Sequence, residues 1–138
     1  MIQLATTDQE ALRCAATLKE LRPQLDEAGF AALFQTLRQD GYQLAFLTRD
    51  DEVCCVAGFR IASNLYLGKY LYVDDLITKA AHRSQGCGAA MLDWLRQHAR
   101  QQQCQALHLD SGVQRYGAHR FYLTQGFNIT SHHFEQRL

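Results

Sequence analysis

The fold of this chain is decided by the stretch VDDLITKAAHRSQGCGA, which occupies residues 73–89. Its first part, residues 73–78, is rich in apolar and β-branched side chains and predicts a strand. After Gly86 the apolar residues return at helical spacing, with Leu92 and Leu95 among those on one face. The stretch therefore predicts a strand that passes through a glycine-containing turn into a helix.

The turn itself, Arg83 to Gly88, has the features of an anion-binding site. The first turn of a helix has N–H groups without intrahelical partners and lies at the positive end of the helix dipole. Glycines let the backbone approach a ligand closely, and such a turn suits a phosphate or a pyrophosphate. The spacing matches neither the phosphate loop of NTPases nor the six-residue dinucleotide fingerprint. A tight turn that only packs on its neighbours is the alternative.

Outward from this stretch, local patterns predict the other elements. Thr7 and Glu10 have the spacing of a capping box, Pro23 predicts the end of the helix that follows, and Gly41 predicts the end of a second helix. Three β-rich runs indicate an antiparallel meander with a hairpin turn at 50–52. Strands are expected at 2–6, 43–49, 53–62, 70–78, 105–110 and 127–137, and helices after Thr7, over 30–37, after Gly86 and over 116–125.

This order of elements predicts one α/β domain over residues 1–138. The expected fold class is a single mixed, mostly antiparallel sheet flanked by helices. A length of 138 residues fits one domain of ordinary size.

Composition excludes several classes of function. The 14 basic and 14 acidic side chains give a formal charge of zero, so neither nucleic acid nor an anionic membrane is an expected partner. No apolar run approaches the roughly 18–20 residues that span a bilayer. The five cysteines are odd in number and lack paired C-x-x-C spacing. They predict reduced thiols, a cytoplasmic location and no metal site.

The turn and two further blocks resemble the GNAT superfamily of N-acetyltransferases. The spacing of Arg83, Gly86 and Gly88 matches the pyrophosphate-binding motif of that family, and residues 73–78 look like the strand before it. Residues 118–127, AHRFYLTQGF, look like the later A-x-x-x-Y-x-x-x-G-F block. The resemblance covers nearly the whole chain. It implies a GNAT-like acyl-CoA N-acyltransferase fold with acetyl-CoA as co-substrate.

The resemblance also implies which residues bind the cofactor. Backbone N–H groups of the turn and of the helix start would wrap the CoA pyrophosphate: Arg83, Ser84, Gln85, Gly86, Cys87, Gly88 and Ala89. A structural role for Arg83, whose side chain would hold the loop, is the alternative at that position. The pantetheine arm would pair with the backbone of Leu76, Ile77 and Thr78 like an added strand. Arg115 stands where many members have an asparagine that contacts CoA. Its guanidinium is expected to reach a phosphate or a substrate carboxylate instead.

Acetyl transfer to an amine requires a neutral amine, donors for the oxyanion and a proton for the departing thiolate. Tyr122 lies where the family places a tyrosine on the CoA sulfur, and it is the expected general acid. Asp75 and Asp74 are candidates to deprotonate a cationic amine or to hold it electrostatically. Because successive strand residues face opposite sides, at most one of the two is expected to face the acceptor. The oxyanion donor is expected near Ile77 or Thr78.

The expected partner is therefore a small-molecule or peptide amine, and the expected activity is that of an N-acetyltransferase. A non-catalytic acyl-CoA binding or sensing module, which keeps the turn without turnover, is the alternative. A purely structural turn is a third reading. Family members are often dimers, and the final strand over 127–137 offers an edge for a homodimer.

Overall fold

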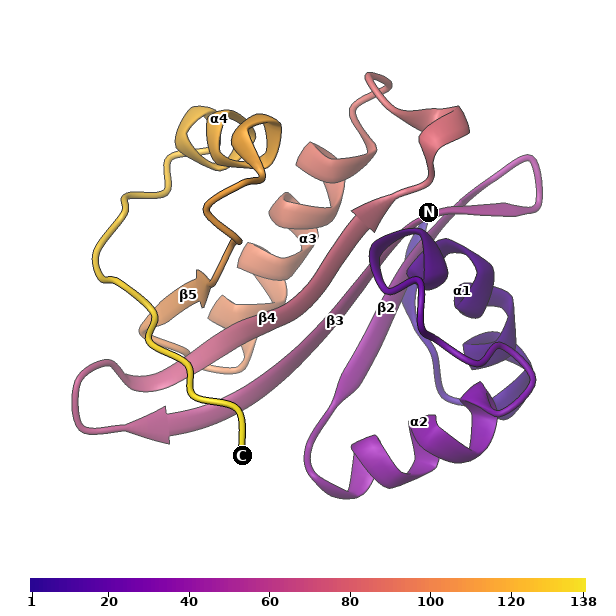
Figure 1. The fold of residues 1–138 in the computed structure, drawn as a ribbon, viewed down its shortest axis with the longest axis horizontal. Coiled ribbons are helices and arrows are strands. Elements are labelled where there is room, and N and C mark those ends of the chain that lie inside the picture. Colours follow the sequence, from indigo (N-terminus) through magenta and orange to yellow (C-terminus); the bar gives the residue numbers. More distant parts are fainter. The chain divides into compact units, whose positions relative to one another are not determined.

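A computed structural model of the protein describes residues 1–138. The chain forms two compact units, Met1–His108 and Leu109–Leu138, and Figure 1 shows the elements of both. The strands are β1 (Ile2–Leu4), β2 (Gln43–Arg49), β3 (Glu52–Asn64), β4 (Gly68–Thr78) and β5 (Ala106–Leu109). The helices are α1 (Asp8–Leu21), α2 (Phe30–Gln39), the short 3-10 helix η1 (Ala80–His82), α3 (Cys87–Gln101) and α4 (Tyr116–Thr124).

The five strands form one sheet in chain order, from β1 to β5. The first four strands are antiparallel neighbours. At the turn between β2 and β3, Asp50 and Asp51 have φ of 50° and 63°, as a tight two-residue hairpin turn requires. Between β4 and β5 the chain passes through α3, which is the type of crossover that joins parallel strands. The mixed, mostly antiparallel sheet predicted from the sequence is confirmed.

The ends of the first two helices follow from local sequence. The Glu10 N–H donates to Thr7 Oγ1 at 3.1 Å, and the Glu10 carboxylate accepts the Thr7 N–H at 3.2 Å, so the predicted capping box is present. Helix α1 ends at Leu21, because Pro23 disfavours the helical conformation in the residue before it. Gly41 follows α2 with φ of +88°, the left-handed conformation that ends many helices.

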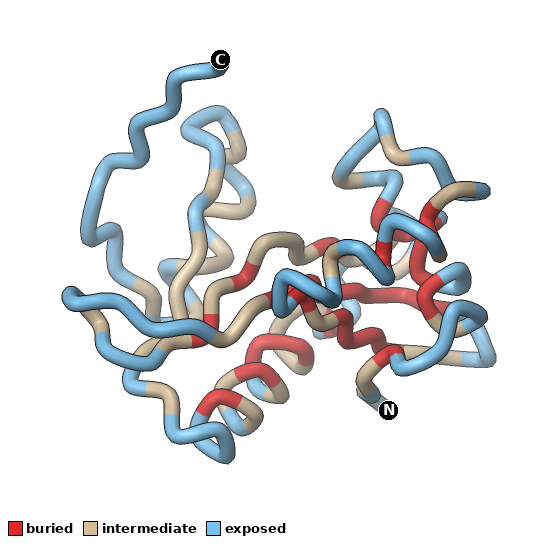
Figure 2. Tube along the Cα trace, turned by 90° about the horizontal axis from the view of Figure 1, so that it is seen from below, coloured by how far each residue is buried: buried red, intermediate tan, exposed pale blue.

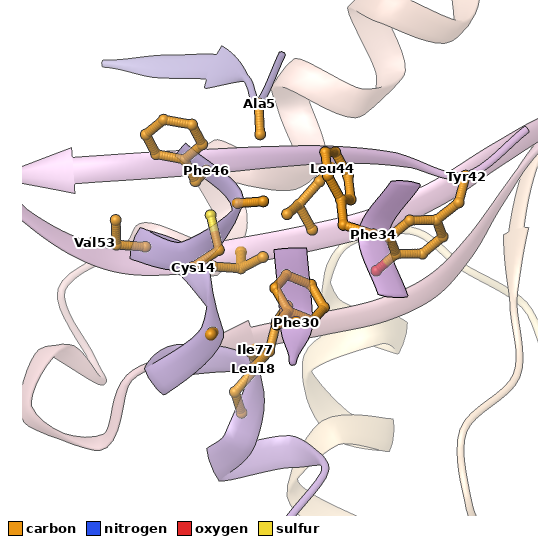
Figure 3. Packing of buried hydrophobic residues seen from close by; sticks show 13 residues of the cluster. Ala5, Cys14, Leu18, Phe30, Phe34, Tyr42, Leu44, Phe46, Val53 and Ile77 are labelled. Carbon is orange, nitrogen blue, oxygen red and sulfur yellow. The ribbon is translucent and has the colours of Figure 1, made fainter. Parts of the chain in front are cut away.

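In the first unit, helices cover both faces of the sheet. Helices α1 and α2 lie over a core cluster that contains Phe34, Leu44 and Phe46 (Figure 3). Helix α3 packs on the opposite face (Figure 1). There Phe59 contacts Trp94 and His98 edge to face, with ring centroids 6.2 and 5.5 Å apart. The sheet is thus buried on two sides, which fixes the face that each strand residue presents.

The second unit contains α4 and the C-terminal segment. Gly126, with φ of +89°, follows the last turn of α4 as the sequence predicts. The prediction of a strand over 127–137 is wrong, because residues 127–138 form no strand. An alternating sequence becomes a strand only where a neighbour pairs with its backbone and one face is buried. The side chains of Ile129 and Phe134 are instead 75% and 92% exposed, and Figure 2 shows the segment before the C-terminus as exposed.

Candidate active site

The chain turns sharply between β4 and α3. Ser84 and Gly86 both have left-handed backbone, with φ of +63° and +79°. Helix α3 begins at Cys87 without a side-chain cap, and no acidic residue lies in its first turn. Its first backbone hydrogen bond runs from the Ala90 N–H to the Gly86 carbonyl at 3.0 Å. The N–H groups of residues 87–89 therefore lack intrahelical partners and lie at the positive end of the helix dipole.

The predicted pyrophosphate-binding residues all belong to this turn and differ in exposure. Residues 83–86 are exposed, and residues 88–89 are partly exposed. A Cβ added at Gly86 would meet no atom within 4 Å, so the backbone there borders open space. Cys87 is buried, with its Sγ 3.7 Å from the Sγ of Cys54. Cys87 can therefore contribute to a ligand site only through its backbone.

A carboxylate that the sequence analysis did not single out anchors the start of this segment. Glu52 on β3 forms an ion pair with Lys79 and a hydrogen bond with His82, whose Nε2 lies 2.8 Å from Glu52 Oε2. The hydrogen bonds from Lys79 and His82 lower the pKa of Glu52. On the other side, the Ala80 N–H donates to Glu20 Oε1 at 2.8 Å. These contacts tie η1 to β3 and to α1. No local motif marks Glu52, because the pairing of β3 with β4 alone brings it to this place.

At the end of β4, one edge of the backbone forms no hydrogen bonds with β3. The Lys79 N–H donates to the Cys54 carbonyl on β3 at 2.8 Å, and the ladder continues in register through Thr78, Ile77 and Leu76. In an antiparallel ladder, residues bonded to the neighbour alternate with residues whose backbone groups point away. The N–H and C=O groups of Leu76 and Thr78 therefore point away from β3, whereas those of Ile77 point toward it.

Strand β5 does not reach this edge. It has four residues against eleven in β4. Gln105, just before β5, donates from its N–H to the Lys69 carbonyl near the start of β4 at 2.6 Å. Strand β5 consequently ends before the position of Leu76. Within the first unit, two of the three predicted pantetheine-binding residues, Leu76 and Thr78, lie at an edge that an extended group can join. The backbone groups of the third, Ile77, point toward β3 instead.

Further back, β4 contains a β-bulge. Asp75 lies opposite Gly58 and Val73 lies opposite Phe59, so Asp74 is an extra residue without a partner on β3. Such a residue shifts the alternation of side chains by one position and changes the direction of those near it.

The contacts of the two carboxylates show the result. Asp75 Oδ2 accepts a hydrogen bond from Tyr42 Oη at 2.8 Å, in the core cluster of the α1–α2 face. Asp74 Oδ2 accepts one from Arg60 Nε at 2.9 Å, and the Arg60 guanidinium lies 5.5 Å from the centroid of the same Tyr42 ring. Both carboxylates therefore face the same side of the sheet. The expectation that they face opposite sides is wrong, because simple alternation does not hold across a bulge.

Arg22 joins the two aspartates to the end of α1. Its Nε donates to Asp75 Oδ1 at 2.9 Å, and its Nη2 donates to the Asp74 carbonyl at 3.0 Å. Arg22 precedes Pro23 and has left the helical conformation, with φ of −120° and ψ of 81°. Pro23 thus both ends α1 and favours the non-helical backbone of Arg22 from which its guanidinium contacts β4.

Tyr42 reaches Asp75 by passing close to Gly58. A Cβ added at Gly58 would lie 1.8 Å from Tyr42 Oη, so the contact requires glycine at this position of β3. A glycine inside a strand pattern is a sequence signal for such a close approach, but it does not show which side chain approaches. Burial, with a contribution from the Asp75 charge, raises the pKa of Tyr42 well above its ordinary value.

The surroundings of Asp74 shift the pKa of its carboxyl group. Burial raises the pKa of Asp74, and the hydrogen bond from Arg60 acts in the opposite direction. Its side chain is 28% exposed, against 15% for Asp75. The two aspartates and the two arginines balance in formal charge.

The other predicted site residues belong to the second unit. Tyr122 on α4 contacts Phe121 and Phe127, with ring centroids 5.5 and 5.7 Å apart, and its carbonyl accepts the Phe127 N–H at 3.0 Å. Arg115 immediately precedes α4, and its carbonyl accepts the His119 N–H at 3.0 Å. The structure thus brings the turn, the edge of β4 and the aspartates together in the first unit, and it places Tyr122 and Arg115 in the second.

The sequence pattern of the Acetyltransferase (GNAT) family matches residues 9–127. The chain belongs to the GNAT family of acetyltransferases. One GNAT relative is the uncharacterised N-acetyltransferase YhdJ of Bacillus subtilis (strain 168), which is 32% identical over 133 residues, 95% of this chain and 94% of that protein. Another is the aminoalkylphosphonate N-acetyltransferase of Salmonella typhimurium (strain LT2), 27% identical over 129 residues, 93% of this chain and 82% of that protein.

A solved structure with the same fold is that of AAC(6')-Iy in complex with the bisubstrate analogue CoA-S-monomethyl-acetylneamine. The TM-score is 0.85 at 14% identity, and the match covers 100% of this chain and 97% of that chain. Membership of the GNAT family supports acetyltransferase activity with acetyl-CoA as co-substrate. The uncapped start of α3 fits the phosphate groups of such a co-substrate.

Two further observations concern metals and membranes. No group of three or more His, Cys, Asp or Glu side chains is arranged to hold a metal ion. No helix combines the length and the apolar character that crossing a membrane requires.

Proposed function

We propose that this GNAT protein transfers the acetyl group of acetyl-CoA to a primary amine of a small molecule or a peptide, with Tyr122 as the general acid. The observation that carries the proposal is the uncapped start of α3 behind the left-handed residues Ser84 and Gly86. Its N–H donors suit the pyrophosphate of CoA. The open edge of Leu76 and Thr78 comes directly before it in the chain and suits the extended pantetheine arm.

The amine nitrogen attacks the thioester carbonyl carbon, and negative charge develops on the carbonyl oxygen. The N–H of Thr78 or Leu76 is the proposed donor to this oxygen, because the Ile77 N–H points toward β3. Collapse of the tetrahedral intermediate breaks the C–S bond, and the thiolate takes the phenolic proton of Tyr122. The nitrogen loses its remaining extra proton, which restores the tyrosine through solvent.

A primary amine is largely protonated at neutral pH and must first lose one proton. Asp74 is the proposed acceptor of that proton, directly or through water, because burial raises its pKa. Asp75 is bonded to both Arg22 and Tyr42, so its proposed role is to hold the ammonium group by charge.

The acceptor is proposed to be a small molecule that carries an anionic group as well as the amine. The Salmonella relative is named for aminoalkylphosphonates, which combine both charges. Arg22 and Arg60, whose side chains are 47% and 32% exposed, lie beside the aspartates. This alternation of cations and anions suits an acceptor of mixed charge.

The test is an acetyl-CoA assay over a panel of amines, together with CoA calorimetry, on the wild type, Tyr122→Phe and the control Tyr116→Phe. Tyr116 lies on the same helix and is 67% exposed. We expect Tyr122→Phe to bind CoA like the wild type and to turn over at least roughly 100-fold more slowly, because the thiolate then leaves without a positioned acid. Tyr116→Phe should match the wild type.

Unchanged turnover in Tyr122→Phe would reject the acid role. CoA binding by the wild type without turnover of any amine would favour the non-catalytic acyl-CoA module. Absence of CoA binding at millimolar concentration would exclude both functions and leave a structural turn.

A further inference from the structure

The turn before α3 holds a strained backbone that its own residues do not explain. Ser84 has φ of +63° without being glycine, and a non-glycine residue in this region has a conformational cost. Such a conformation persists where surrounding contacts enforce it. A side chain from the end of another strand contacts the next residue, Gln85.

Arg49, the last residue of β2, donates from Nη1 to the Gln85 carbonyl at 3.2 Å and to Gln85 Oε1 at 3.4 Å. One guanidinium thus contacts both the backbone and the side chain of the residue between Ser84 and Gly86. A charged donor forms a stronger hydrogen bond to a carbonyl than a neutral one. Residues 83–86 of the turn are exposed, so few packing contacts compete with this bond in fixing their conformation.

The bond has a consequence for the next N–H group. In a trans peptide the C=O and the N–H point in opposite directions, and the structure contains no cis peptide. The Gln85 carbonyl points toward Arg49, so the Gly86 N–H points away from Arg49. The same bond keeps a carbonyl oxygen, with its negative partial charge, on the side of β2. The Gln85 carbonyl is thus bonded to Arg49 and not to the N–H donors at the start of α3.

We propose that Arg49 is a positioning residue for the phosphate groups of the acyl donor: it turns the Gln85–Gly86 peptide so that its N–H joins the donors at the start of α3. This inference rests on the proposed function. It assigns a role to Arg49, a residue 34 positions before the turn. The effect of Arg49 should be specific to acyl donors that carry a pyrophosphate.

The experiment compares wild type, Arg49→Gln and the control Arg13→Gln. Arg13 bonds Asp51 in the neighbouring hairpin, at 3.1 Å to the carbonyl and 3.3 Å to Oδ1. Both variants therefore remove one positive charge that contacts a turn. The measurements are the Kd of CoA by calorimetry and kcat/KM for two donors, acetyl-CoA and S-acetylpantetheine, which lacks the pyrophosphate and the nucleotide.

We expect Arg49→Gln to weaken CoA binding about tenfold, the order of effect of one charge-assisted hydrogen bond. The preference for acetyl-CoA over S-acetylpantetheine should fall by a similar factor, and Arg13→Gln should change neither quantity by more than about twofold. Wild-type CoA affinity in Arg49→Gln would overturn the inference. So would an equal loss with both donors, since general damage to the fold does not discriminate between them. Failure of the wild type to bind CoA would instead refute the proposed function.

Discussion

The bulge of β4 and the end of β4 lie in the same strand, yet their polar groups are satisfied in different ways. At the bulge, the carboxylates of Asp74 and Asp75 bond to arginine and tyrosine side chains from other elements. At the end, the backbone edge of Leu76 and Thr78 and the start of α3 present donors that no side chain caps.

The difference indicates how each region meets a ligand. Backbone donors without partners gain hydrogen bonds when an anion arrives, and they have no internal bonds to break first. Paired side chains have to exchange partners, so their contribution to binding depends on what replaces each bond. The end of β4 is therefore suited to a constant co-substrate, and the bulge to selection among acceptors.

The largest expected effect tests the end of β4. Gly86→Asp should weaken CoA binding at least about 100-fold, or roughly 2.7 kcal/mol, measured by calorimetry. The added carboxylate repels the pyrophosphate and competes for the same N–H groups. A Cβ at Gly86 meets no atom within 4 Å, so charge rather than crowding within the chain should dominate.

Two controls separate charge from conformation. Gly86→Asn has nearly the same shape without the charge, and asparagine tolerates left-handed φ. Gly41→Asp makes the same substitution at another glycine with positive φ and open space beside it. Both should keep CoA affinity within a few-fold of the wild type. An equal loss in Gly86→Asn would show that the effect is conformational.

The second prediction tests the bulge. Asp75→Asn should lower the free energy of unfolding by about 2 kcal/mol, because it leaves the mostly buried Tyr42 hydroxyl and the Arg22 guanidinium with a weaker acceptor. Urea denaturation measures the change. Asp93→Asn removes an exposed ion pair with Arg96 on α3 and should cost less than about 0.5 kcal/mol. Equal effects of the two substitutions would mean that the network at the bulge adds no more than a surface pair.

The smallest prediction concerns alkaline pH. The pKa of Tyr42 is raised well above about 10 in the folded protein. Its hydroxyl stays protonated where the unfolded chain ionises, so the stability it contributes is complete below pH 10 and declines as the pH rises toward the raised pKa. From pH 9 to 11 the wild type should lose about 1.4 kcal/mol more than Tyr42→Phe. Other buried groups titrate equally in both proteins. Identical pH profiles would contradict the prediction.

Local sequence predicted the features that local chemistry determines. The Thr7 capping box, the helix end before Pro23 and the glycine turn before α3 each depend on residues within a few positions of one another. The order of strands in the meander followed from short turns, and the structure agrees. The spacing therefore predicted the turn itself, whereas its role in binding CoA came from the resemblance to GNAT acetyltransferases and stays a prediction.

Features that depend on pairing between strands were missed. The bulge at Asp74 depends on how β4 aligns with β3. No residue near Asp74 in the sequence indicates that β4 has an extra residue there. Glu52 contacts Lys79 from 27 positions away in the sequence, and Arg49 contacts Gln85 from 36 positions away. The prediction of a strand over 127–137 was wrong for the same reason, because an alternating sequence does not provide another strand to pair with.

The burial of the cysteines has a practical consequence for measuring this chemistry. Four of the five thiols are buried and only Cys104 is partly exposed. Burial raises the pKa of Cys14 and Cys55 to about 12 and that of Cys54 to about 11, and the thiolate is the form that attacks disulfide reagents. A colorimetric disulfide reagent that reports released CoA should therefore meet little background from the folded enzyme. Unfolding would expose the four buried thiols, so a rise of the signal in a control without the amine would report unfolded enzyme.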